Sequence, residues 1–150
     1  MISKMQCHLL KSGFLIISII LLTGCPWGGV KYFPAEKINA WMNKSNVCFF
    51  IPDSKDYQPV FIAINLRSTP SKARSFIDSP ELQVADGQLC IPSSYFHLPD
   101  TSVDPLIVEF VLQSQAENDH PRSFVSGFSI ANGIIKNIPL TKREYDEPEH

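Results

Sequence analysis

The sequence has few of the residues and none of the short motifs that enzymes use for chemistry. Of its four histidines, His8 lies near the N-terminus and His150 ends the chain, which leaves His97 and His120 as single loop residues. There is no H-E-x-x-H pair, no closely spaced cysteine pair, no G-x-S-x-G elbow and no phosphate-binding glycine loop. We therefore expect no catalytic residue, no metal ligand and no cofactor, and a protein that is not an enzyme.

An excess of positive charge is also missing. The chain has 13 Lys+Arg against 15 Asp+Glu, a formal net charge of −2. Proteins that bind nucleic acid neutralise its phosphates with an excess of lysine and arginine. This balance excludes nucleic acid as an expected partner.

Long helices are not expected in the body of the chain. All 12 prolines of the 150 residues lie after residue 24, and a proline removes a backbone donor and interrupts a helix. The length suits one domain of ordinary size. These features favour a single all-β domain after residue 24.

The first 24 residues have the build of a secretory signal peptide. Residues 1–11 carry Lys4 and Lys11 and no acid, and residues 14–22 form an apolar run in which only Ser18 is polar. At about 1.5 Å per residue, this run covers less than half of a bilayer core of about 30 Å. A permanent transmembrane helix is the weaker interpretation.

The residues after the apolar run resemble a bacterial lipobox. Leu22-Thr23-Gly24-Cys25 places small residues before a cysteine. The resemblance implies cleavage after residue 24 and a covalent lipid on Cys25, which would anchor the protein in membrane lipid. Residues 25–36 would then form the lipidated N-terminus and its tether. The alternative is an ordinary secreted protein with a chance cysteine at this position.

The residue after Cys25 helps to predict which membrane the protein is sorted to. Pro26 does not match the aspartate that resembles the inner-membrane retention signal of enterobacterial lipoproteins. We therefore expect the periplasmic face of the outer membrane of the cell envelope, with the inner membrane left open as the alternative. Removal of Lys4 and Lys11 with the signal peptide would change the formal charge from −2 to −4.

Two of the four cysteines remain for the folded domain. Cys7 would leave with the signal peptide and Cys25 would carry lipid, so Cys48 and Cys90 are left in an oxidising compartment. A bond between them would close a loop of about 42 residues and contribute roughly 4 kcal/mol in the chain-entropy model. We expect this disulfide; a pair of free or metal-binding thiols is the alternative.

Two dipeptides predict tight hairpins. A two-residue turn at Asp86-Gly87 places its apolar residues on one face. Its register gives the cross-strand pairs Val84–Leu89 and Leu82–Ile91. A turn at Asn132-Gly133 gives the pairs Ile130–Ile135 and Phe128–Asn137, unless a bulge shifts the register.

Other segments alternate as strands do. The apolar stripes are Val60, Ile62, Ile64 and Leu66, and Leu106, Val108, Phe110 and Leu112; residues 37–42 and 47–51 add two more strands. About eight strands at regular spacing predict a single β-sandwich over residues 37–140, for which an immunoglobulin-like arrangement is one option. Residues 141–150 are polar and acidic, and we expect a flexible tail.

Aromatic residues in loops are the candidates for binding a protein partner. The longest expected loops are residues 67–80 and residues 92–104. Tyr95 and Phe96 lie in the second of these loops, and Tyr57 lies in a shorter one. The alternative for each is that the ring packs beneath its own loop.

Five segments together resemble a family of small enterobacterial lipoproteins described as type VI secretion immunity lipoproteins. The segments are residues 25–29 (CPWGG), 47–53 (VCFFIPD), 56–60 (DYQPV), 86–92 (DGQLCIP) and 137–141 (NIPLT). The resemblance implies a periplasmic lipoprotein that binds and neutralises a toxin effector. The alternative is an envelope accessory lipoprotein that binds an envelope component or an assembly partner.

Overall fold

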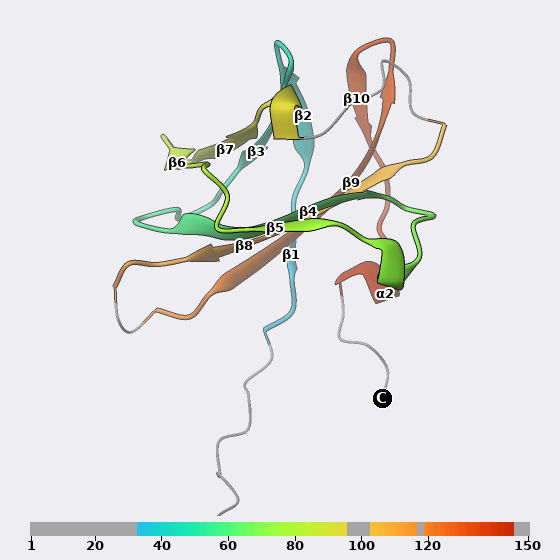
Figure 1. Ribbon diagram of the computed structural model, residues 1–150. Coiled ribbons are helices and arrows are strands. Elements are labelled where there is room, and N and C mark those ends of the chain that lie inside the picture. Colours follow the sequence, from blue (N-terminus) through green and yellow to red (C-terminus); the bar gives the residue numbers. More distant parts are fainter. Residues whose placement is uncertain (1–32, 96–102, 117–118, 146–150) are drawn as a thin grey trace, which may run out of the picture. The chain divides into compact units, whose positions relative to one another are not determined.

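The computed structural model describes residues 33–95, 103–116 and 119–145 (Figure 1). The chain divides into two compact units, Met1–Lys31 and Tyr32–His150, and every described residue lies in the second. The predictions for the signal peptide, Cys25, Phe96, His97 and residues 146–150 therefore fall outside the described residues. Among the described residues, no helix is both long and apolar enough to cross a membrane.

The described chain forms two β-sheets and three short helical segments. The six-stranded sheet has the order β1-β9-β8-β4-β5, with β10 also paired to β9, and the four-stranded sheet has the order β2-β3-β7-β6. The strands are β1 (Glu36–Lys37), β2 (Ala40–Asn43), β3 (Asn46–Phe50), β4 (Gln58–Leu66), β5 (Phe76–Asp78), β6 (Val84–Ala85), β7 (Gln88–Ile91), β8 (Leu106–Gln113), β9 (Arg122–Ala131) and β10 (Ile134–Asn137). The helical segments are η1 (Ser71–Ala73), η2 (Ser93–Tyr95) and α2 (Lys142–Tyr145).

This strand order is that of an immunoglobulin-like sandwich. In that convention β2-β3-β7-β6 is the A-B-E-D sheet, and β9-β8-β4-β5 is the G-F-C sheet extended by C′. The strands β1 and β10 are additions along β9. The predicted all-β sandwich is confirmed, with ten strands described in place of about eight because several pairings are only two or three residues long.

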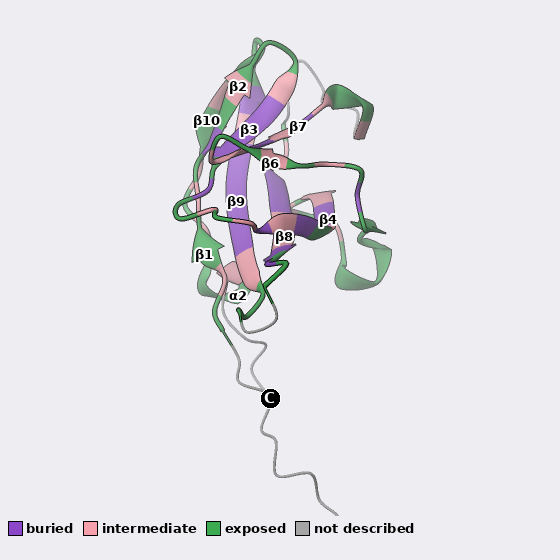
Figure 2. Ribbon diagram, turned by 90° about the vertical axis from the view of Figure 1, so that its left-hand side faces the viewer, coloured by how far each residue is buried: buried purple, intermediate pink, exposed green. Residues whose placement is uncertain are grey.

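Alternating apolar residues place the core between the two sheets. Leu106, Val108, Phe110 and Leu112 on β8 are all buried, as their alternation predicts. Phe110 contacts Phe49 of the four-stranded sheet, with ring centroids 5.2 Å apart. Figure 2 shows a continuous buried band along β9, with further buried residues on β3 and β8.

Both predicted hairpins form around two-residue turns. Asp86, Gly87, Asn132 and Gly133 all have positive φ, which the mirror-image turn of a two-residue hairpin requires. The pairs Val84–Leu89, Ile130–Ile135 and Phe128–Asn137 are confirmed, so the second hairpin has no bulge.

One predicted cross-strand pair is wrong. Ile91 pairs with Val47 of β3, and Leu82 lies before β6, outside any strand. The backbone N–H of Leu82 bonds to the carbonyl of Pro80, a tight turn that takes the chain out of the ladder.

The disulfide between Cys48 and Cys90 is confirmed. The two residues are register partners on β3 and β7. They lie on the outer face of the four-stranded sheet, since Val47 and Phe49 on either side of Cys48 face the core. The bond therefore joins neighbouring strands of one sheet and does not cross the core.

The single strand predicted for residues 37–42 is two strands in different sheets. Lys37 of β1 runs parallel to β9, whereas Ala40 of β2 pairs with Phe49 of β3. Each part is fixed by a side chain: Arg122 of β9 holds Glu36, and Asn137 of β10 bonds to the N–H and C=O of Ala40 at 2.8 and 2.9 Å. The chain therefore crosses from one sheet to the other between them.

Three further expectations need correction. The stripe on β4 is only partly buried, because a register shift between Pro59 and Phe61 leaves Val60 36% exposed, and Leu66 at the strand end is 43% exposed. The loop of residues 67–80 contains η1 and β5. Part of the segment expected as a tail is helical, because Lys142–Tyr145 form α2.

Candidate functional site

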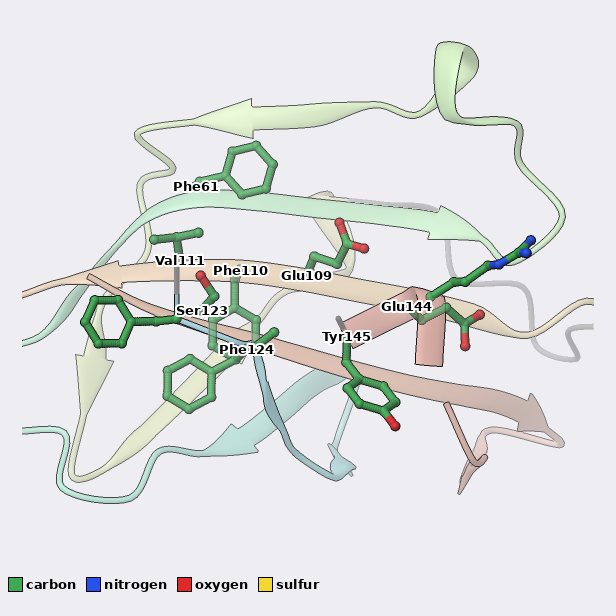
Figure 3. Close-up of a pocket in the computed structure, with 11 residues that line it drawn as sticks. Phe61, Glu109, Phe110, Val111, Ser123, Phe124, Glu144 and Tyr145 are labelled. Carbon is green, nitrogen blue, oxygen red and sulfur yellow. The ribbon is translucent and has the colours of Figure 1, made fainter. Parts of the chain in front are cut away.

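A cleft of about 260 Å³ lies on the outer face of the six-stranded sheet. Its floor is formed by β4, β8 and β9, with Glu144 and Tyr145 of α2 at one side (Figure 3). Phe33, at the start of the described chain, also lines it. The lining combines aromatic, aliphatic and polar side chains, among them Phe33, Phe61, Glu109, Val111, Ser123 and Tyr145.

The alternation of β4 and β8 directs these side chains outward. Ile62 and Phe110 are register partners that face the core, so their neighbours Phe61, Glu109 and Val111 point to the opposite face. An outer sheet face exposed to water ordinarily carries polar residues. Here an aromatic ring and a branched apolar side chain flank a single carboxylate.

The C-terminal wall of the cleft is held by an ion pair. The Arg67 guanidinium donates to both carboxylate oxygens of Glu144 at 2.6 and 2.7 Å and to the carbonyl of Pro139 at 2.9 Å. The backbone N–H of Thr141 also donates to Glu144. These bonds, chiefly those from Arg67, lower the pKa of Glu144 to about 2. We refer to Arg67, Glu144 and Pro139 as the C-terminal clasp.

The chain before α2 lies directly on the sheet. Gly127 of β9 has no side chain, and an added Cβ would come within 2.9 Å of Leu140 and 3.1 Å of Ile138. The N–H of Ile138 bonds to the carbonyl of Gly127 at 2.9 Å. The C-terminal segment thus covers one part of the outer face and leaves the part with the cleft open.

The N-terminal wall is held by a second arginine. Arg122 donates to both carboxylate oxygens of Glu36 at 2.8 Å and to the carbonyl of Pro52 at 2.7 Å. Its guanidinium lies 4.9 Å from the ring centroid of Phe124, and the bonds with Glu36 raise its pKa. The ammonium of Lys37 on β1 lies 3.4 Å from the ring centroid of Tyr145. This contact joins β1, on the N-terminal side of the cleft, to α2 on its C-terminal side.

An apolar patch adjoins the cleft. The ring of Phe61 stacks on that of Phe76 of β5 with centroids 5.6 Å apart. Phe76 is 60% exposed on this outer face. Ile77 is the register partner of Ile62, so its side chain lies on the other side of the sheet. Arg74 bridges to Glu109 of the cleft with 3.7 Å between N and O. The outer face therefore presents two stacked aromatic rings with a few charges at their margin.

The structure does not bring the predicted binding residues to this face. Tyr57 is 7% exposed, and its hydroxyl donates to the carbonyl of His120 at 3.0 Å, so its ring is packed into the domain as the alternative for this residue expected. Tyr95 is half-buried and packs against the core. Phe96 and the expected lipid-bearing Cys25 lie outside the described residues.

Sequence reasoning missed Phe61, Phe76 and Tyr145. Phe61 carried a signal, because an aromatic residue stood on the polar side of the alternation in residues 60–66. No sequence pattern pointed to Phe76 or Tyr145, because Phe76 lay in a segment expected to be a loop and Tyr145 in a segment expected to be a tail.

The cleft has the dimensions and chemistry to receive one side chain of a partner. Aromatic walls give contact area to an apolar group, and Glu109 and Ser123 offer polar atoms beside it. In the described part of the chain, no three His, Cys, Asp or Glu residues are grouped to hold a metal ion. Asp56 accepts hydrogen bonds from the hydroxyl of Ser114 and the N–H of Ala116, which lower its pKa and shape the loop.

Comparison with known proteins gives one match. No curated protein and no solved structure matches the chain. A family described as Domain of unknown function (DUF7480) matches residues 35–133. The match spans every described strand except β10, includes the disulfide and the floor of the cleft, and covers about two thirds of the chain. The chain belongs to this family.

Proposed function

We propose that the protein is a lipid-anchored periplasmic immunity protein, which binds a type VI secretion effector on the outer face of its six-stranded sheet and neutralises it without catalysis. The observation that carries the proposal is the apolar surface formed by the stacked rings of Phe61 and Phe76 beside the cleft. Contiguous exposed apolar surface on a small domain marks a site of interaction with another protein.

The form of this face supports tight binding of a folded partner. The cleft would receive a protruding side chain at the centre of the interface, while the stacked rings of Phe61 and Phe76 would exclude water around it. The C-terminal clasp and the Arg122–Glu36 pair hold the cleft walls in place before binding, which reduces the entropy lost on association.

The sequence supports the location. The lipobox ending at Cys25 would tether the domain to the membrane after cleavage, and Pro26 favours the periplasmic face of the outer membrane. Confinement at the membrane surface would raise the effective concentration of the domain against an incoming effector.

The test is protection against the effector encoded beside the gene. The candidate effector is directed to the periplasm of cells that carry the wild-type protein, the Phe61→Asp variant or the Phe50→Asp variant. Phe50 is the matched control, because it is a phenylalanine 61% exposed near the end of β3, outside the cleft and its patch. We expect wild type and Phe50→Asp to protect, and Phe61→Asp to lose at least tenfold in surviving cells.

Equal killing with and without the wild-type protein would contradict the immunity function for that effector. Equal protection by the two aspartate variants would contradict the assignment of the site. Retention of the Cys48–Cys90 disulfide in each variant, seen by gel mobility with and without reductant, shows that the domain has folded.

A separate experiment tests the anchor. The Cys25→Ala variant should leave the membrane fraction, because no thiol remains to carry lipid. A variant that still sediments with membranes would show that the lipobox interpretation is wrong.

A further inference from the structure

The strand β5 forms the outer edge of the six-stranded sheet beside β4 (Figure 1). Every residue from 71 to 79 is exposed. At the centre of this stretch Phe76 is 60% exposed and Ile77 is 40% exposed. Edge strands of natural proteins are normally protected from pairing by covering elements or charge, and here the middle of the edge is apolar and, among the described residues, uncovered.

The backbone groups of β5 alternate between its neighbour and solvent. The N–H of Ser75 bonds to the side-chain oxygen of Asn65, and the N–H of Ser79 bonds to the carbonyl of Val60, each at 2.8 Å. Because successive residues of a strand direct these groups to opposite sides, the N–H and C=O of Phe76 and Asp78 point away from β4. The edge therefore offers two donors and two acceptors in the plane of the sheet.

The charges around this edge are arranged in two halves. Lys72 and Arg74 precede the strand, and Asp78 and Glu81 end or follow it. When the same segment is laid beside itself in the antiparallel direction, the basic half of one copy meets the acidic half of the other. Opposite charges placed across a strand pair favour that pairing, and a parallel arrangement would set like charges together.

We propose that two copies of this protein associate through β5, with the two strands antiparallel and joined by a two-fold axis at Ile77. Phe76 would then lie opposite Asp78 of the second copy, and these residues would exchange the N–H···O bonds left open at the edge. The two Ile77 side chains would meet at the axis and extend the apolar core across the interface. This inference does not rest on the proposed function.

Proline limits the length of the pairing, and symmetry limits the number of copies. Pro80 has no N–H, so the ladder cannot extend beyond Asp78. A two-fold pairing uses the same surface on both copies and is closed, because each copy has one β5 edge. The expected product is therefore a dimer and not a fibre.

The experiment uses disulfide cross-linking of the full chain in bacterial membranes. At a two-fold axis between antiparallel strands, the two copies of residue 77 form a non-hydrogen-bonded pair with Cα atoms about 4.5 Å apart, close enough for a disulfide. With copper(II)-phenanthroline as oxidant, Ile77→Cys should run mostly as a dimer on a non-reducing gel and as a monomer after reduction. The control is Phe50→Cys, an exposed position near the end of β3. Equal cross-linking at the two positions would overturn the proposal.

Charge reversal tests the direction of pairing. Adding Lys72→Glu to Ile77→Cys should reduce the dimer at least fivefold, because acidic residues then face each other. Adding Glu81→Lys as well should restore the dimer, since the acidic residue at position 72 of one copy then faces the basic residue at position 81 of the other. Both residues are exposed, so the substitutions leave the fold intact. A dimer yield that does not respond to Lys72→Glu, or that Glu81→Lys fails to restore, would overturn the antiparallel arrangement.

Discussion

Replacement of Glu144 by glutamine should release the C-terminal segment from the sheet. The substitution keeps the size of the side chain and removes the charge that pairs with Arg67. In the folded protein the pKa of Glu144 is about 2, against an ordinary value of 4.5. At about 1.4 kcal/mol for each tenfold change in proton affinity, this difference sets an upper limit of about 3.5 kcal/mol.

Solvent exposure lowers that figure. The side chains of Arg67 and Glu144 are 30% and 13% exposed, so water screens part of their interaction. We therefore expect the clasp to lose about 1–2 kcal/mol. Because the effect is local, the assay is exchange of the Ile138 amide, which bonds to Gly127 beneath the segment.

At pH 6 the Ile138 amide should exchange about tenfold faster in Glu144→Gln than in the wild type. A carboxylate whose pKa is lowered by folding stabilises the protein above its unfolded pKa, and the contribution is lost as pH falls through the folded pKa. The difference between the two proteins should therefore shrink between pH 4.5 and 2. Glu109→Gln is the control, because its partner Arg74 is 3.7 Å away and both side chains are more than a third exposed. Equal Ile138 exchange in wild type and Glu144→Gln at pH 6 would refute the clasp.

Three other substitutions test the packing of the domain by urea unfolding. Replacing Cys48 and Cys90 with alanine should lower the free energy of unfolding by about 4 kcal/mol, because the bond closes a 42-residue loop; an unchanged urea midpoint would contradict this. Arg122→Ala should cost about 2 kcal/mol through loss of its charged hydrogen bonds, and Arg122→Lys should recover only part of it; full recovery would show that the paired geometry is unimportant. Ser126→Ala should leave stability unchanged or raise it by about 1 kcal/mol, since the buried hydroxyl has no hydrogen-bond partner among the described residues, and a loss above 1 kcal/mol would argue against that view.

Strand positions were largely predictable because their causes are local. The side chains of β8 alternate with a period of two, and the dipeptides Asp86-Gly87 and Asn132-Gly133 can adopt the positive φ angles that their turns need. The partner predicted for Asn137 was also correct, although no sequence pattern explains an amide opposite Phe128. The structure supplies the explanation, because the Asn137 side chain bonds to the backbone of β2.

The candidate site was much less predictable. Tyr57 stood in a polar loop and looked available for binding, yet its ring is buried and its hydroxyl bonds to His120. Phe76 is part of the candidate site only because β5 pairs with β4, which stacks the Phe76 ring on that of Phe61. Neither outcome follows from neighbours in the sequence, because each depends on a contact with a distant segment or another strand.

The sequence by itself determined the class of fold, the two hairpins and the pairing of Cys48 with Cys90, since side-chain periodicity, turn conformation and cysteine count act over short stretches or by elimination. Only the tertiary structure decided that residues 36–43 divide between two sheets and that a C-terminal segment closes one side of the cleft. The clasp joins Arg67 to Glu144 across 77 residues of sequence. An ion pair of that kind depends on where two strands and a terminus meet in space, and no local pattern encodes it.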